Sequence, residues 1–140
     1  MNIQEVHNYL ISYHIKPSAQ RVTIMRYLLE HLTHPTIDRI YNDLVPSMPT
    51  LSKTTVYNTL KLFNDKRAVT ALFIDEKNVR YDSDTAIHAH FRCKNCGIIN
   101  DVPLEKSNIP QFRDNSDLCP EETQIYFLGK CEKCIKKRQQ

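Results

Sequence analysis

The sequence predicts an α+β fold, in which an N-terminal winged helix-turn-helix domain is followed by a small α/β domain with a structural zinc site. Three observations lead to this prediction. Apolar patterns of helical period fill the first half of the 140 residues, a two-stranded hairpin pattern follows them, and two Cys-x-x-Cys pairs lie in the second half. So short a second half has a thin core, and a bound metal ion would supply part of its stability.

Two helices are predicted before residue 32. The apolar spacing of the first begins at Ile3 and stops before Pro17, since a proline disfavours helix in the residue that precedes it. Ser18 has the side chain of a helix cap and opens the second helix. We expect that helix to continue to His31, with Leu32 among its inward positions.

Two further helices complete the N-terminal pattern. Thr36 caps a short third helix, and a fourth follows the cap Ser52 and runs from Lys53 to about Asp65. One face of the fourth helix bears hydrogen-bonding side chains and an aromatic ring that suit base edges and phosphates: Thr54, Thr55, Tyr57, Asn58 and Lys61. Any solvated surface helix also presents a polar face, so the surrounding elements decide between the two interpretations.

A hairpin follows the helices. Strands are predicted at Ala68–Ile74 and Val79–Asp82, with a polar turn between them. Helices followed by such a hairpin describe a winged helix-turn-helix, which is a DNA-binding arrangement. The polar run Asp82–Ala86 is typical of a hinge, so we place the domain boundary there, with a winged-helix DNA-binding domain at 1–83 and a metal-binding domain at 84–140.

Charge and hydropathy narrow the class of partner. The formal net charge is +3, and the segment Lys16–Arg67 holds eight basic and four acidic residues, a net charge of +4 that favours nucleic acid. No apolar run approaches the roughly 18 residues of a membrane helix, and the first residues lack the apolar core of a signal peptide. We therefore expect a cytoplasmic protein, in a reducing compartment where Cys-x-x-Cys pairs are more often metal ligands than disulfides.

The elements beyond the hinge are shorter. The sequence predicts, in order, a strand at Ile87–Arg92, a strand at Ile98–Val102, a short helix near Leu104–Phe112, a loop at Asp114–Glu122 and a strand at Thr123–Lys130. Cys119 is the odd cysteine in that loop, and we assign it no role. The basic C-terminal tail is expected to be a frayed terminus.

The cysteine pairs carry the strongest chemical signal. Four thiolates, from Cys93, Cys96, Cys131 and Cys134, would surround one tetrahedral zinc ion if the segment between the pairs folds back. Redox dithiols or disulfides are the alternative. Two pairs with the same internal spacing favour zinc.

A histidine pair precedes the first cysteine pair. Residues two apart in a strand point to one face, so His88 and His90 would project side by side as metal ligands. An isolated His-x-His pair is more often two solvated surface histidines, and the pair by itself leaves that alternative open.

Seven segments keep an order and spacing that together are specific to one protein family. They are Pro17-Ser-Ala-Gln-Arg21, His34-Pro-Thr36, Ser52-Lys-Thr-Thr-Val-Tyr-Asn58, Arg80-Tyr-Asp82, His88-Ala-His90, Cys93-Lys-Asn-Cys96-Gly97 and Cys131-Glu-Lys-Cys134. With them the chain resembles the ferric uptake regulator (Fur) family over essentially its whole length, and most of all the peroxide-sensing branch. The resemblance implies a homodimer that binds a palindromic, AT-rich operator in double-stranded DNA and dimerises through its C-terminal α/β domain.

The resemblance also implies a regulatory metal site, made of His34, Asp82, His88, His90 and Asp101. Three imidazoles and two carboxylates without a thiolate suit Fe(II) or Mn(II). Aspartate at position 101, where iron-sensing members typically carry glutamate, is typical of the peroxide branch. Arg21 and Tyr57 fall on the family's DNA-contacting positions. Residues 121–125 contain no histidine, so we expect no third metal site.

In the peroxide branch, iron-catalysed oxidation of ligand histidines releases the repressor from DNA, and the resemblance assigns this role to His34 and His88. The protein is then a regulator and not an enzyme. Three alternatives remain: an iron- or zinc-responsive uptake repressor of the same family, a small non-haem iron enzyme, and a zinc-ribbon module that binds RNA or protein. The enzyme alternative assigns no function to the polar face of the fourth helix. The zinc-ribbon alternative does not explain His34 or Asp82.

Overall fold

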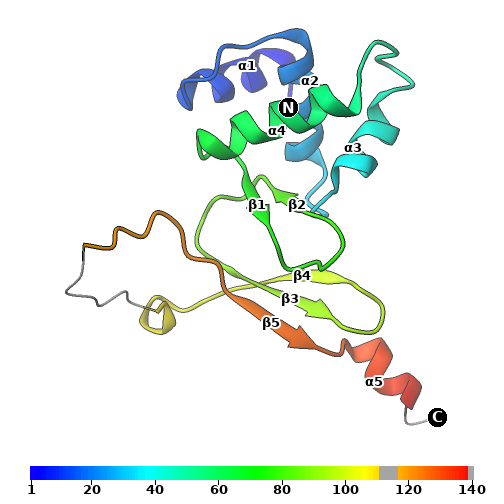
Figure 1. Ribbon diagram of the computed structural model, residues 1–140, viewed down its shortest axis with the longest axis vertical. Coiled ribbons are helices and arrows are strands. Elements are labelled where there is room, and N and C mark those ends of the chain that lie inside the picture. The colour runs from blue at the N-terminus through cyan, green and yellow to red at the C-terminus, as the bar shows by residue number, and fades with distance from the viewer. Residues whose placement is uncertain (111–116, 139–140) are drawn as a thin grey trace. The chain divides into compact units, whose positions relative to one another are not determined.

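A computed structural model of the chain describes residues 1–110 and 117–138 (Figure 1). The chain divides into two compact units, Met1–Thr85 and Ala86–Gln140. Helices dominate the first unit and a three-stranded sheet dominates the second, so the predicted α+β class is confirmed. No described helix combines the length and hydropathy needed to cross a bilayer.

Four helices form most of the N-terminal unit: α1 (Ile3–Ser12), α2 (Ala19–Glu30), α3 (Ile37–Leu44) and α4 (Lys53–Asp65). Each begins at a polar side chain that accepts a backbone N–H of the first turn, from the caps Asn2, Ser18, Thr36 and Ser52. Asn2 and Glu5 form a reciprocal capping box. Local sequence therefore sets where each helix starts.

One apolar core joins the four helices. Its fully buried members include Leu10 from α1, Met25 from α2, Ile40 from α3 and Phe63 from α4. The placement of Leu32 in this core was wrong, because that side chain is 66% exposed. The helix ends at Glu30, and the non-helical backbone of the next residue breaks the helical phase that the spacing assumed.

A short hairpin completes the N-terminal unit. β1 (Thr70–Leu72) and β2 (Arg80–Asp82) pair antiparallel, with Thr70 opposite Asp82. Both strands are shorter than predicted. Asp82, which the sequence placed at the start of the hinge, is the last residue of β2 and is buried.

The C-terminal unit is built on a sheet with strand order β4-β3-β5 (Figure 1). The strands are β3 (Ala89–Cys93), β4 (Ile99–Val102) and β5 (Tyr126–Gly129). β3 and β4 form an antiparallel pair, whereas β5 returns from a distant part of the chain and pairs with β3 in parallel. The end of β5 therefore lies beside the end of β3, and each strand leads into one cysteine pair.

Two predictions for this unit were wrong in part. The helix expected near residues 104–112 is a single 3-10 turn, η1 (Lys106–Asn108), and the last two residues of that prediction lie outside the described residues. The tail expected to be frayed contains a helix, α5 (Glu132–Arg138), stabilised by an ion pair between Glu132 and Lys136 at 2.7 Å. The predicted loop at 114–122 also begins outside the described residues.

Candidate functional site

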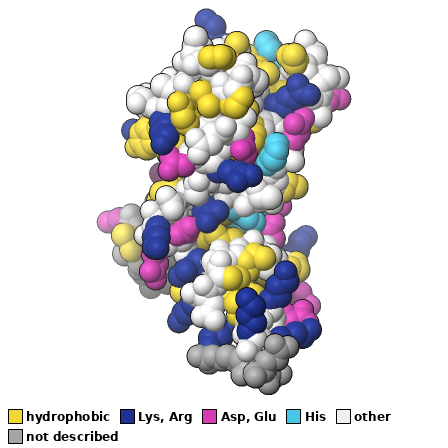
Figure 2. All heavy atoms as spheres, turned by 90° about the vertical axis from the view of Figure 1, so that its right-hand side faces the viewer, with side chains coloured by type: hydrophobic (Ala, Val, Ile, Leu, Met, Phe, Trp, Pro, Cys, Tyr) yellow, Lys and Arg dark blue, Asp and Glu magenta, His cyan; other side chains and the backbone are white. Residues whose placement is uncertain are grey.

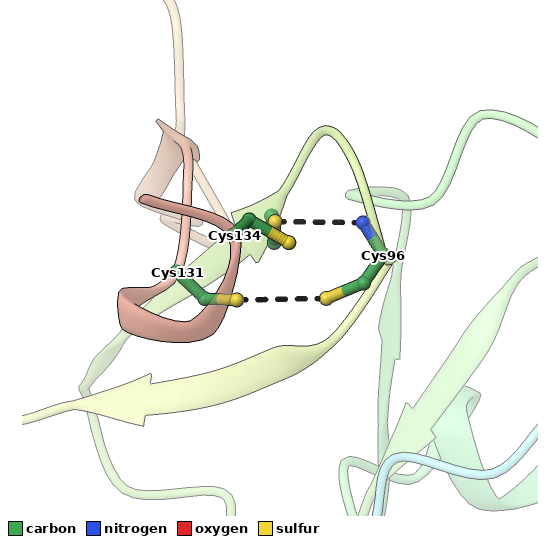
Figure 3. Close-up of side chains that lie close together, drawn as sticks. Cys96, Cys131 and Cys134 are labelled. Atoms are coloured by element: carbon green, nitrogen blue, oxygen red, sulfur yellow. Dashed lines mark hydrogen bonds between the residues drawn. The ribbon is translucent and has the colours of Figure 1, made fainter. Parts of the chain in front are cut away.

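The four paired cysteines converge at one end of the sheet, and Figure 3 labels three of them, Cys96, Cys131 and Cys134. One sulfur from each of Cys93, Cys96, Cys131 and Cys134 lies within 4.8 Å of all the others. Cys96 Sγ and Cys131 Sγ are 3.6 Å apart. In a tetrahedron with metal–sulfur bonds of about 2.3 Å the sulfurs are about 3.8 Å apart, so the cluster has the size of a zinc site.

The backbone explains why these thiols meet. Gly97 has a φ of 78°, a left-handed conformation that favours glycine, and its N–H donates to the Cys93 carbonyl at 3.0 Å to close the first knuckle. The N–H of Lys94 donates to the carbonyl of Gly129 at 2.7 Å, which ties this knuckle to the end of β5. Beyond β5, Cys131 lies directly before α5 and Cys134 lies within it.

Two thiols of this cluster differ in how readily they lose a proton. Hydrogen bonds from backbone N–H groups, that of Cys96 first, lower the pKa of Cys93 to about 5. The neighbouring thiols, that of Cys131 first, raise the pKa of Cys134 to about 12. One thiol is thus ready to ionise while another is held neutral, and a divalent ion would favour four thiolates together.

A second cluster, of nitrogen and oxygen atoms, lies on β3 and β4. The Nε2 atoms of His88 and His90 are 3.0 Å apart, and each is 3.3 Å from Oδ1 of Asp101. His90 and Asp101 are direct partners in the β3–β4 register, which explains their proximity. His88 lies just before β3 rather than inside it, so the prediction of two histidines on one strand was wrong in that detail. Their imidazoles nevertheless face each other.

A hydrogen bond of His88 determines which of its ring nitrogens faces this cluster. His88 Nδ1 lies 2.7 Å from the Ala86 carbonyl, which accepts only from a protonated nitrogen, so the neutral ring carries its lone pair on Nε2. That lone pair is directed towards His90 and Asp101, where a metal ion would have two imidazole nitrogens and a carboxylate oxygen in reach. Fixing the tautomer through the remote nitrogen is how proteins orient histidine ligands.

The other two expected ligands belong to the N-terminal unit. His34 Nε2 lies 3.7 Å from Asp82 Oδ2. Sequence reasoning assigned no role to Arg80 or Asp75. Arg80 donates from Nη1 to the His34 carbonyl, and its Nε and Nη2 donate to Asp75. The only sequence feature that connects Arg80 to the site is its place in the segment Arg80-Tyr-Asp82. No local pattern indicated that Arg80 would contact His34.

The side chains expected to contact DNA differ in solvent exposure. On α4, Thr54, Tyr57, Asn58 and Lys61 are exposed, with Tyr57 at 50%. Thr55 is half-buried and accepts a hydrogen bond from Ser52 Oγ. Arg21 is half-buried and donates to the Lys16 carbonyl at 2.8 Å. On the face in Figure 2, Lys and Arg side chains are scattered over both units, several beside acidic ones.

Comparison with known proteins identifies a family with which this chain shares most of its length. The model of the ferric uptake regulator family matches residues 12–116. The peroxide-responsive repressor PerR of Staphylococcus aureus strain Mu50 is 36% identical over 124 residues, which cover 86% of this chain and 82% of the relative.

Solved structures show the same likeness. PerR from Streptococcus pyogenes, described as a structural basis for peroxide sensing and gene regulation, has a TM-score of 0.52 and 27% identity over 94% of this chain and 92% of its own. The ferric uptake regulator of Francisella tularensis, solved with iron, has a TM-score of 0.67 over 86% of this chain and 95% of its own. At 19% identity the second comparison shows a common fold alone.

Proposed function

Because the chain belongs to the ferric uptake regulator family, we propose that it is a peroxide-responsive, metal-dependent transcriptional repressor that binds operator DNA as a homodimer. The observation that carries this proposal is a pair of chemically distinct clusters: four thiols in one place, and imidazoles with a carboxylate in another. One cluster suits a structural ion and the other a sensing ion.

The thiol cluster is proposed to hold structural Zn(II). All five cysteines are free thiols, and four of them gather at the size of a zinc tetrahedron, with two buried. A structural zinc site uses four protein ligands and leaves no open position, so it stabilises the fold and takes no part in sensing. Relatives solved with zinc support this assignment, among them the one described as PerR-Zn-Zn.

The sensing ion is proposed to be Fe(II) or Mn(II), held by His34, Asp82, His88, His90 and Asp101. A set of three imidazoles and two carboxylates is harder than a thiolate set and suits these metals. His34 and Asp82 belong to one compact unit and the other three to the next. An ion bound by all five would therefore restrict the hinge between the units.

Restricting the hinge is how metal binding would control DNA binding. In a dimer, two recognition helices enter successive major grooves only when they are about 34 Å apart, so a ligand that selects one hinge angle raises operator affinity. α4 would supply the recognition helix, with the exposed face that bears Tyr57, Asn58 and Lys61. Arg21 and the two threonines Thr54 and Thr55 are proposed as further contacts.

Peroxide is proposed to act through the histidine ligands. Iron(II), when bound, supplies the electrons that activate hydrogen peroxide, and manganese(II) does not do so readily. Overall, one peroxide oxygen is added to an imidazole of His34 or His88 and the other leaves as water. An oxidised imidazole is a poorer ligand, so the ion would be lost and the hinge released.

The test is mass spectrometry of the peptides that contain His34 and His88 after mild peroxide treatment. We expect the added mass of one oxygen atom in the iron form and no added mass in the manganese form, with loss of operator binding only in the iron form. Unmodified histidines and retained DNA binding in the iron form would instead identify an iron- or zinc-responsive uptake repressor.

A further inference from the structure

Both ligands expected from the N-terminal unit depend on one short strand, β2. Asp82 is the last residue of β2. The preceding residue, Tyr81, donates its backbone N–H to the Pro35 carbonyl at 3.1 Å. Arg80 donates from Nη1 to the His34 carbonyl at 3.3 Å. The loop that carries His34 is therefore attached to the strand that carries Asp82 by hydrogen bonds from two successive residues.

The Arg80 guanidinium is itself held from the other side. Its Nε and Nη2 donate to Oδ2 of Asp75 at 3.1 and 3.0 Å. The other carboxylate oxygen of Asp75 accepts the backbone N–H of Lys77 at 2.9 Å, inside the turn between β1 and β2. The hairpin turn, Asp75, Arg80 and His34 thus form one continuous chain of hydrogen bonds, in which a planar guanidinium is fixed on two edges.

His34 has a backbone conformation that needs such support. Its φ is 55°, in the left-handed region that residues with a Cβ seldom adopt. A strained conformation of this kind persists when the surrounding contacts determine it. Arg80 donates to the carbonyl of His34 itself. The hydrogen bond therefore holds the peptide group that directly follows the strained residue.

We propose that Arg80 is a positioning residue of the sensing site: anchored by Asp75, it holds His34 in the backbone conformation from which the imidazole serves as a ligand. This inference rests on the proposed function. Without the guanidinium, His34 would relax towards negative φ and its imidazole would leave the position beside Asp82. Asp82 itself, held within the β ladder, would remain in place.

The experiment compares Arg80→Ala, Arg80→Lys and Asp75→Asn with a matched control, Arg26→Ala, in zinc-loaded protein. Arg26 also pairs with a carboxylate, Glu30, but on the exposed surface of α2. We expect Mn(II) affinity, measured by calorimetry, to fall about 10- to 100-fold in Arg80→Ala, as is usual when an outer-shell partner of a ligand is lost. A lysine has the charge without the fork and should not restore affinity. Asp75→Asn should lose less, and Arg26→Ala should match the wild type.

A second measurement needs no sensing metal. In the zinc-loaded protein without manganese, Arg80→Ala should speed hydrogen exchange at the Tyr81 amide, which donates to the loop beside His34, while amides of α4 keep their protection. Unchanged exchange at Tyr81 would overturn the proposal, as would an Arg80→Ala protein that binds Mn(II) like the wild type. If Arg80→Ala does not fold, Asp75→Asn carries both measurements with the guanidinium retained.

If the proposed function is wrong, the wild-type protein itself gives the contradicting result. A wild-type protein that binds no Mn(II) at micromolar concentration would contradict the sensing site. The exchange experiment would still decide whether Arg80 holds the His34 loop.

Discussion

Asp75 shows how much one side chain contributes to the N-terminal unit. Its carboxylate accepts from the backbone of the hairpin turn and from the guanidinium that reaches His34. The N–H of Lys77 first, and then Arg80, hold the pKa of this carboxyl below its ordinary value. The folded protein therefore retains the negative charge at a pH where the unfolded chain has already taken up a proton.

This shift predicts a pH dependence. The stabilisation from Asp75 is present above its unfolded pKa of about 3.9 and is lost as the pH falls through the lower folded pKa. We expect Asp75→Asn to lower the free energy of unfolding at pH 7 and to make the fall of that free energy below about pH 4 shallower than in the wild type.

Urea titrations at several pH values, followed by tyrosine fluorescence because the chain lacks tryptophan, measure both effects. Two stability curves that run parallel from neutral to acid pH would contradict the assignment.

Among the secondary-structure elements, helix starts were the most predictable feature. Ser18, Thr36 and Ser52 each accept an N–H from a residue three positions on, so the whole interaction lies within one turn of chain. The helix α5 was missed because its seven residues are too few to show a period, and its stability depends on packing and on the site it adjoins.

The position of α5 leads to a prediction about zinc. Cys134 is the one clustered cysteine within α5, and it is buried. Replacing Cys134 with serine should remove about one zinc per chain and unfold the C-terminal unit, because the binding energy of a structural zinc is also folding energy. Cys119→Ser is the matched control, since Cys119 is exposed and stands apart from the four clustered thiols.

Metal analysis by mass spectrometry, with circular dichroism and sizing of both variants, provides the measurement. A Cys134→Ser protein that keeps its zinc and its fold, or a Cys119→Ser protein that loses them, would remove the basis for the assignment.

For the molecule as a whole, metal and DNA binding should be linked. Titrating Mn(II) into zinc-loaded protein should raise operator affinity by at least about fivefold, which corresponds to the lower end of allosteric coupling energies of about 1–3 kcal/mol. By reciprocity, operator DNA should raise Mn(II) affinity by the same factor.

Tyr57→Ala should separate operator binding from Mn(II) binding. The side chain is half exposed on α4, so its removal should leave folding and Mn(II) binding intact. Loss of one good base contact costs about 1–3 kcal/mol, and we expect operator affinity to fall roughly 10- to 100-fold. Ile11→Ala, on the exposed side of α1, is the control. Fluorescence anisotropy at fixed salt measures all of these affinities, and a Tyr57→Ala protein that binds the operator normally would exclude α4 as the recognition helix.

Features that depend on neighbouring residues could be predicted from the sequence. The helix caps Ser18, Thr36 and Ser52, the buried side of α4 and the two cysteine pairs were readable from local spacing within a turn, a helix or a knuckle. The nitrogen and oxygen ligands were expected only from the family resemblance. The functional roles of the two halves of the chain, and of the nine metal ligands named from sequence, stay predictions.

Contacts between distant segments became visible only in the folded chain. β5 pairs with β3 in parallel across more than thirty residues, and this pairing brings the second cysteine pair to the first. The strand register, not the spacing of His88 and His90, brings Asp101 to them. Arg80 reaches His34 across 46 residues of chain. These contacts form because whole helices and strands pack together. The free energy of that packing is distributed over many side chains, so no local pattern in the sequence predicts the contacts.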